Sequence, residues 1–178
     1  MTKPQTDKYQ NALEFAEKKH KGQFRKGGKE YITHPIAVSD IVKSWGYGTD
    51  YQICALFHDL LEDTDADEFE IEALSSAEVL NAVKLVTKRK GYVMAEYIAG
   101  IRADKMAFTI KAADRLHNLI SAKDTNEKFK LKYLLETIDW YLDFSPEIVA
   151  AAKDLAKTLK TPINSLPPEY TKIKELLK

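Results

Sequence analysis

The stretch that decides the fold is ICALFHDLLEDT, at residues 53–64. From Ile53 to Leu61 its side chains are apolar except for those of His58 and Asp59, which stand next to each other in the middle of the run. A run of this length is too short to span a membrane and indicates a helix buried in a globular core. Burying an imidazole and a carboxylate is costly unless each finds a polar or charged partner. The stretch therefore predicts a buried helix that contains a polar site.

A helix through this stretch gathers polar groups around one space. At about 100° per residue, His58, Asp59 and Glu62 fall on one side of the helix, with Asp63 at the edge of that arc. A divalent metal ion would satisfy the buried imidazole and carboxylate together. The plainer interpretation is a His58–Asp59 hydrogen bond in the core and a solvated acidic helix end. This stretch alone does not separate the two.

The composition argues against some classes of function. The 178-residue chain carries 27 basic and 27 acidic side chains, so no net charge draws it to nucleic acid or to a membrane surface. Its one cysteine, Cys54, cannot form an internal disulfide, which suits the reducing cytosol. Nothing near the N-terminus resembles a signal peptide, and no apolar stretch is long enough to span a bilayer. We expect a cytoplasmic protein that binds neither nucleic acid nor a membrane, and the oligomeric state stays open.

Apolar stripes at helical spacing run along the whole chain, and no segment shows the period-two alternation that is typical of a strand. The fold class that we expect is therefore all-α. The main helices are expected at residues 7–19, 33–46, about 51–64, 67–74, 76–86, 105–122, 125–144 and 146–159. Caps are expected from Asp50 for the third of these helices, from Asp104 for the helix that begins at Lys105, and from a Ser75–Glu78 capping box.

Two further residues extend the candidate metal site. His34 stands at or just before the start of a helix, where a side chain can be fixed pointing into a cleft. Asp114 lies in a half-apolar helical stretch beside two alanines that leave room around it. Together with His58 and Asp59 they form a mixed nitrogen and oxygen donor set, which suits Mn²⁺, Fe²⁺ or Zn²⁺ better than a thiolate-seeking metal. Taken singly, Asp114 is equally well explained by an ion pair with a neighbouring lysine or arginine.

Three segments carry a resemblance to a known family. They are HKGQFRKGGKEYITHP at residues 20–35, ALFHDLLEDT at residues 55–64 and KAADRLHN at residues 111–118. In this order they resemble the HD-domain metal-dependent phosphohydrolases, and within these the hydrolase domain of RelA/SpoT-type alarmone enzymes and their stand-alone small relatives. The resemblance runs from about Ala12 to Asn118. It implies an HD-domain helical bundle, which we expect over residues 1–160, followed by a C-terminal tail, residues 161–178, with one short helix packed on the domain.

The resemblance implies roles for individual residues. His34, His58, Asp59 and Asp114 would hold one divalent cation, in this family usually manganese. Glu62 and Asp63 would orient the attacking water and handle its protons. Arg25 and Lys26 would lie against the nucleotide base, and Asn118 would lie near the ribose or the metal ligands. A single metal is favoured because only two histidines, His20 and His117, remain to hold a second one.

The reaction that the resemblance implies is removal of the 3′-pyrophosphate from (p)ppGpp, which gives GDP or GTP and pyrophosphate. The residue types agree with this chemistry, because a metal ion polarises a phosphoryl group, a carboxylate accepts the proton of water, and a guanidinium stacks on a purine. The segment from Gly91 to Asp104 is shorter than in most alarmone hydrolases, so NADPH, a 5′-nucleotide or another phosphorylated nucleoside stays open as substrate. A nucleotide-sensing module without turnover is the alternative of another class, and the intact Glu62 and Asp63 argue against it.

Overall fold

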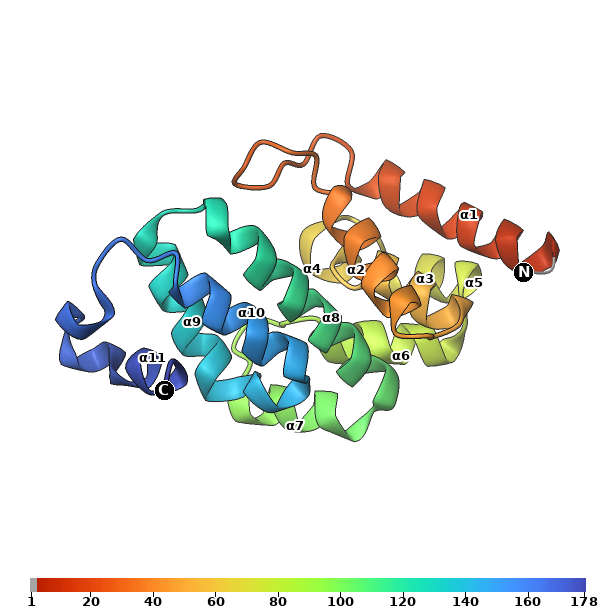
Figure 1. Ribbon diagram of the computed structural model, residues 1–178. Coiled ribbons are helices and arrows are strands. Elements are labelled where there is room, and N and C mark those ends of the chain that lie inside the picture. The colour runs from red at the N-terminus through yellow and green to blue at the C-terminus, as the bar shows by residue number, and fades with distance from the viewer. Residues whose placement is uncertain (1–2) are drawn as a thin grey trace. The chain divides into compact units, whose positions relative to one another are not determined.

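The computed structural model describes residues 3–178, and these residues form helices and loops only (Figure 1). Within this part of the chain the one extended pairing is an isolated bridge between Phe24 and Glu30. The α-helices are α1 Lys3–Lys19, α2 Thr33–Ser44, α3 Thr49–Phe57, α4 Leu60–Asp63, α5 Glu68–Leu74, α6 Ala77–Val86, α7 Met94–Ala103, α8 Lys105–Ser121, α9 Glu127–Trp140, α10 Pro146–Ala156 and α11 Thr171–Leu176. The all-α prediction is confirmed.

The chain divides into two compact units, one that ends at Asp114 and one that runs from Arg115 to Lys178. The first unit contains α1 to α7 and the first part of α8, and the second contains the rest of α8 and the helices that follow it. The domain boundary that we predicted at residue 160 stays a prediction.

Helix α3 is the centre of the first unit. Its residues from Gln52 to Phe57 are all buried, and the helix packs against α1, α2 and α6. At its C-terminal end, the ring of Phe57 meets the ring of Phe15 from α1 edge to face, with 5.7 Å between their centroids. The apolar run that starts at Ile53 therefore forms the core of this unit, as its composition predicts.

The prediction of one helix across residues 53–64 is wrong. Helix α3 ends at Phe57 and α4 begins at Leu60, so His58 and Asp59 lie in the turn between two helices. A continuing helix would offer the carbonyl of Ala55 to the amide of Asp59. Here that carbonyl accepts a hydrogen bond from Nδ1 of His58 at 2.7 Å. The side chain has taken over a backbone partner, and the chain turns at the two residues on which the candidate site depends.

The predicted helix caps have mixed outcomes. Oδ1 of Asp104 accepts from the amide of Ala107 at 2.8 Å, so the cap of α8 is confirmed. The N-cap of α3 is Gly48, and the side chain of Asp50 pairs with Lys8 instead, so the predicted Asp50 cap is wrong. The capping box predicted from Ser75 to Glu78 is also wrong, because the N-cap of α6 is Ser76. The capping box of this region lies on α5, between Asp67 and Glu70.

The second unit is organised around a buried arginine. The guanidinium of Arg115 lies between the rings of Tyr133 and Tyr141, 4.3 and 4.0 Å from their centroids, and one of its nitrogens donates to Glu136 at 2.6 Å. Stacking and charge pairing together offset the burial of this cation. In the tail, α11 packs against α9. Across the residues that the structure describes, no helix has both the length and the apolar character needed to cross a membrane.

Candidate metal centre

His34 is fixed in the first turn of α2. Its backbone amide donates to the carbonyl of Tyr31 at 2.9 Å, and Pro35 follows, whose missing N–H is not needed at this point of a helix. The imidazole is buried and turned into the first unit. The helix start that the sequence predicts at Thr33 therefore sets the place of the first candidate ligand.

His58 has a defined tautomer. A carbonyl oxygen can only accept, so Nδ1, which bonds to Ala55 O, carries the proton in the neutral ring. The other nitrogen, Nε2, then presents a bare lone pair. This atom is buried and has no hydrogen-bond partner of good geometry, although Oδ2 of Asp59 lies only 3.1 Å away. Two electron-rich atoms at this distance require a cation between them, either a proton or a metal ion.

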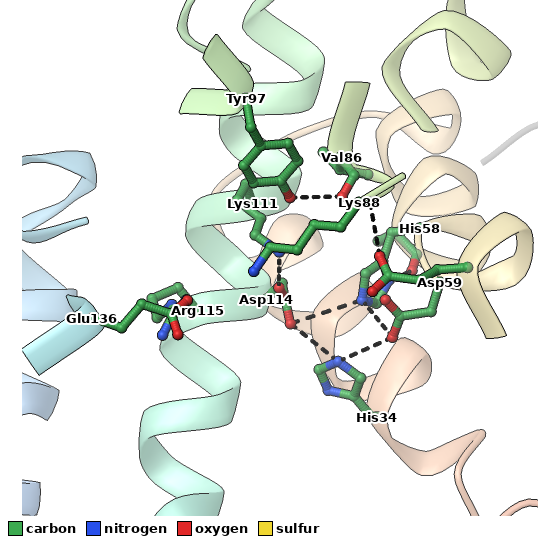
Figure 2. A network of polar contacts seen from close by, with 12 residues as sticks. His34, His58, Asp59, Val86, Lys88, Tyr97, Lys111, Asp114, Arg115 and Glu136 are labelled. Carbon is green, nitrogen blue, oxygen red and sulfur yellow. Dashed lines mark hydrogen bonds and ion pairs between the residues drawn. The ribbon is translucent and has the colours of Figure 1, made fainter. Parts of the chain in front are cut away.

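Four side chains meet at this point, from α2, the α3–α4 turn and α8 (Figure 2). Nε2 of His34 lies 3.6 Å from Oδ2 of Asp59 and 3.1 Å from Oδ1 of Asp114. Nε2 of His58 lies 3.1 and 3.8 Å from the same two oxygens. Ligands about 2.1 Å from a tetrahedral metal are separated from each other by about 3.4 Å, and those of an octahedral metal by about 3.0 Å. His34, His58 and Asp59 each offer a ligand atom close enough to the other two to share a single ion, and Oδ1 of Asp114 lies next to both imidazoles.

Asp114 uses its two oxygens differently. Oδ1 faces the imidazoles, while Oδ2 accepts from the ammonium of Lys111, one helical turn earlier, at 2.9 Å. The ion pair and the candidate ligand role, which the sequence presents as alternatives, thus occur together in one carboxylate. A charged partner on the outer oxygen also fixes the direction of the inner one.

Neighbouring positive groups keep both carboxylates of the site ionised. Burial would raise the pKa of Asp59, but His58 beside it holds that pKa well below the usual range. Burial would also raise the pKa of Asp114, but Lys111 and His34 hold that pKa low. For His58 burial lowers the pKa, but the Asp59 carboxylate outweighs burial and raises it to about 9. For His34 burial prevails and the pKa is lowered. Two ionised carboxylates and two imidazoles are a donor set that a divalent cation suits.

Glu62 and Asp63 lie beside this cluster on the short helix α4. Oε2 of Glu62 accepts from the backbone amide of Lys88 at 2.9 Å, and desolvation raises the pKa of this carboxyl. Oδ2 of Asp63 lies 3.0 Å from the hydroxyl of Tyr31. Both carboxyls remain accessible to solvent, as a group that exchanges protons with water must be.

Arg25 and Lys26 lie in the loop between α1 and α2. The loop closes on itself, because the amide of Arg25 donates to Lys29 O at 2.9 Å and the amide of Gly28 donates to Arg25 O at 2.8 Å. Gly28 has a φ of +81°, which favours glycine. Asn118 is half-buried on α8, in the second unit. The substrate contacts predicted for these three residues stay predictions.

Sequence reasoning missed one residue at the site. The hydroxyl of Tyr31 donates to Oδ2 of Asp59 at 2.7 Å, and no spacing rule connects a loop tyrosine to that carboxylate. Its place within the segment that resembles the alarmone enzymes, three residues before His34, was the available signal.

Comparison with known proteins assigns the chain to a family. Residues 12–145 match the HD domain. The chain belongs to the HD-domain family. This confirms the family resemblance, and HD-domain hydrolases use a divalent metal, for which the His34–His58–Asp59 cluster provides candidate ligands.

The relatives that the chain matches are named as enzymes that make or hydrolyse (p)ppGpp. The chain is 37% identical over 121 residues to the guanosine-3′,5′-bis(diphosphate) 3′-pyrophosphohydrolase of Spiroplasma citri, which covers 62% of this chain and 16% of that protein. It is 33% identical over 139 residues to the bifunctional (p)ppGpp synthase/hydrolase RelA of Mycobacterium tuberculosis, covering 73% of this chain and 19% of that protein. The chain thus spans less than a fifth of the length of these relatives. A solved structure of a metazoan SpoT ortholog that hydrolyses ppGpp shares the fold, with a TM-score of 0.58, 24% identity, and 95% of this chain and 93% of that one covered.

Proposed function

We propose that this protein is a metal-dependent phosphohydrolase that removes the 3′-pyrophosphate of (p)ppGpp. The observation that carries the proposal is the convergence of four candidate ligand atoms from three separate segments, around a buried imidazole nitrogen that makes no hydrogen bond. The curated relatives that carry this activity in their names add the substrate class.

We propose one Mn²⁺ ion as the cofactor, held by His34, His58, Asp59 and Asp114. Two imidazoles and two carboxylates leave coordination positions for water and for a phosphoryl oxygen on a metal that prefers six ligands. When bound, such an ion polarises the phosphoryl group and lowers the pKa of a coordinated water. The side chains themselves hold the ion in place, because the outer atoms of His58 and Asp114 are bonded to Ala55 and Lys111.

Glu62 is the group that we propose accepts the proton of the attacking water. The amide of Lys88 orients its carboxylate. Desolvation raises the pKa of Glu62 toward neutral pH, and a carboxylate with a higher pKa is a stronger base. Asp63 follows it on the same short helix and is proposed to orient that water. Loss of the pyrophosphate leaves a hydroxyl at the ribose 3′ position, so the proton removed from water is balanced by one delivered to the leaving oxygen.

Arg25, Lys26 and Asn118 are the proposed nucleotide contacts. A planar guanidinium can stack on guanine and also reach its edge, which an ammonium cannot do. Arg25 lies in a loop that is closed by its own backbone hydrogen bonds, so binding a base there costs little additional ordering.

The test is hydrolysis of defined nucleotides by the purified chain. The protein, stripped of metal and reloaded with Mn²⁺, is incubated separately with ppGpp, pppGpp, NADPH and GMP, and the products are resolved by anion-exchange chromatography. We expect GDP or GTP together with pyrophosphate, and no product when the metal is omitted. Asp59→Ala is the matched inactive variant.

Each other outcome replaces part of the proposal. Phosphate released from NADPH or GMP, with ppGpp intact, would keep the metal hydrolase and reject the alarmone substrate. Tight binding of ppGpp without any product would favour a nucleotide sensor. Hydrolysis that persists in Asp59→Ala would place the activity outside this site.

A further inference from the structure

The hydroxyl of Tyr31 lies between two carboxylates. Its oxygen is 2.7 Å from Oδ2 of Asp59 and 3.0 Å from Oδ2 of Asp63. A phenol has one proton to donate, and the shorter distance assigns it to Asp59. An ionised carboxylate oxygen can only accept, so the hydroxyl is the donor in this contact.

The oxygen that Tyr31 contacts is the one that faces the two histidines. Oδ2 of Asp59 lies 3.1 Å from Nε2 of His58 and 3.6 Å from Nε2 of His34. A carboxylate oxygen has two lone pairs, and a donor on one of them directs the other. Rotation of the carboxylate away from the histidines would break the bond to Tyr31.

Tyr31 is itself held on several sides. Its ring packs on that of His20 in a tilted arrangement with 4.8 Å between the centroids, and it meets the ring of His34 edge to face at 6.0 Å. Its backbone amide donates to the carbonyl of Gln23 at 2.9 Å. The side chain of Gln23 in turn accepts from Nδ1 of His20 at 2.8 Å and donates to the carbonyl of Asp63 at 2.6 Å.

These contacts fasten both ends of the α1–α2 loop to Asp63. Gln23, near the start of the loop, bonds to the main chain of Asp63, and Tyr31, at its end, reaches the side chain. A donor held in this way keeps one orientation, which a side chain on a free loop would not.

We propose that Tyr31 is a positioning residue of the metal centre, whose hydroxyl aims Oδ2 of Asp59 at the space between His34 and His58. This rests on the metal site of the proposed function. Donors in the layer behind metal ligands typically change metal affinity by about 10- to 100-fold when they are removed, and we expect a loss in this range for Tyr31→Phe. The phenyl ring keeps the packing against His20, so we expect the fold to be retained.

The experiment compares Tyr31→Phe with Tyr9→Phe in the full chain. Tyr9 is a partly buried tyrosine of α1 whose hydroxyl lies 3.3 Å from Oγ of Ser39, so its variant loses one hydroxyl contact away from the cluster. Metal-free protein is titrated with Mn²⁺ in competition with a chelating dye, and then with Co²⁺, whose visible absorption reports ligand geometry. We expect weaker Mn²⁺ binding and a shifted Co²⁺ spectrum for Tyr31→Phe only.

The outcomes separate this inference from the proposed function. If wild-type protein binds neither ion tightly, the metal site fails and the inference fails with it. If wild-type protein binds both ions, and Tyr31→Phe matches Tyr9→Phe in affinity and spectrum, the metal site stands and the role of Tyr31 is rejected. A purely structural role would change the stability of Tyr31→Phe and leave the Co²⁺ spectrum of its folded form unaltered.

Discussion

Replacing Lys111 by methionine should destabilise the metal-free protein far more than the metal-loaded one. The ammonium of Lys111 lies 2.9 Å from Oδ2 of Asp114, and the side chains are only 12% and 8% exposed. Removing one partner of a buried ion pair costs about 3 to 5 kcal/mol, because the other charge is left in a poorly solvating environment. Nε2 of His34 lies 3.1 Å from Oδ1 of the same carboxylate and partly compensates for the lost ammonium. We therefore expect the free energy of unfolding to fall by about 3 kcal/mol.

A bound divalent ion should reduce the stability that Lys111→Met loses, because the ion supplies positive charge to the same carboxylate. Lys111 orients the Asp114 carboxylate but also offsets its charge. Loss of the buried counter-charge is the larger of the two effects, so the variant should bind metal more tightly than the wild type. By linkage, the tighter binding offsets part of the lost stability when metal is present. The destabilisation measured with saturating Mn²⁺ should therefore be smaller than the destabilisation measured with a chelator.

The assay is urea unfolding followed by tryptophan fluorescence, with and without Mn²⁺. Lys19→Met is the matched control, because the Lys19 side chain is also 12% exposed but its partners Asp65 and Glu70 are 89% and 37% exposed. We expect a much smaller loss for the control, with no dependence on metal. Equal losses for the two variants, or a loss for Lys111→Met that metal leaves unchanged, would refute the reasoning.

Three further variants test other parts of the account. Asp59→Ala should abolish retention of metal through gel filtration, and unchanged metal content by elemental analysis would remove Asp59 from the ligand set. Glu62→Gln should keep the metal and lose turnover of ppGpp, and a near-normal rate would remove Glu62 from the mechanism. Phe57→Ala should lower the free energy of unfolding by about 3 to 5 kcal/mol, since a fully buried ring that packs on Phe15 is lost, and a change below about 1 kcal/mol in urea unfolding would contradict the central place given to α3.

The sequence carries enough local information to predict much of the fold. Proline placement and capping side chains act within one helical turn, which is why the start of α2 at Thr33 and the Asp104 cap of α8 could be predicted. The helix start predicted at residue 146 is a similar case, since α10 begins at Pro146, directly after its N-cap Ser145. The core helix from Ile53 could be predicted because a helix that is buried on all sides has a continuous run of apolar residues.

The break at His58 and Asp59 could not be predicted in this way. Apolar residues stand on both sides of this turn, so the hydrophobic pattern predicts one continuous helix. What ends α3 is a hydrogen bond from an imidazole to Ala55, which competes with the helix from a side chain that pattern rules treat only as polar. Tyr31 was missed for a related reason, because its contacts with Asp59 and Asp63 depend on how a loop folds back on α4.

The central claim is that four side chains hold one ion, and anomalous diffraction at the manganese edge tests it most directly. Crystals of the protein grown with Mn²⁺ should show a single anomalous peak, within bonding distance of Nε2 of His34, Nε2 of His58, Oδ2 of Asp59 and Oδ1 of Asp114. A second peak of similar height would reject the single-metal site, and a peak away from these four atoms, or none, would contradict the account of the metal centre itself.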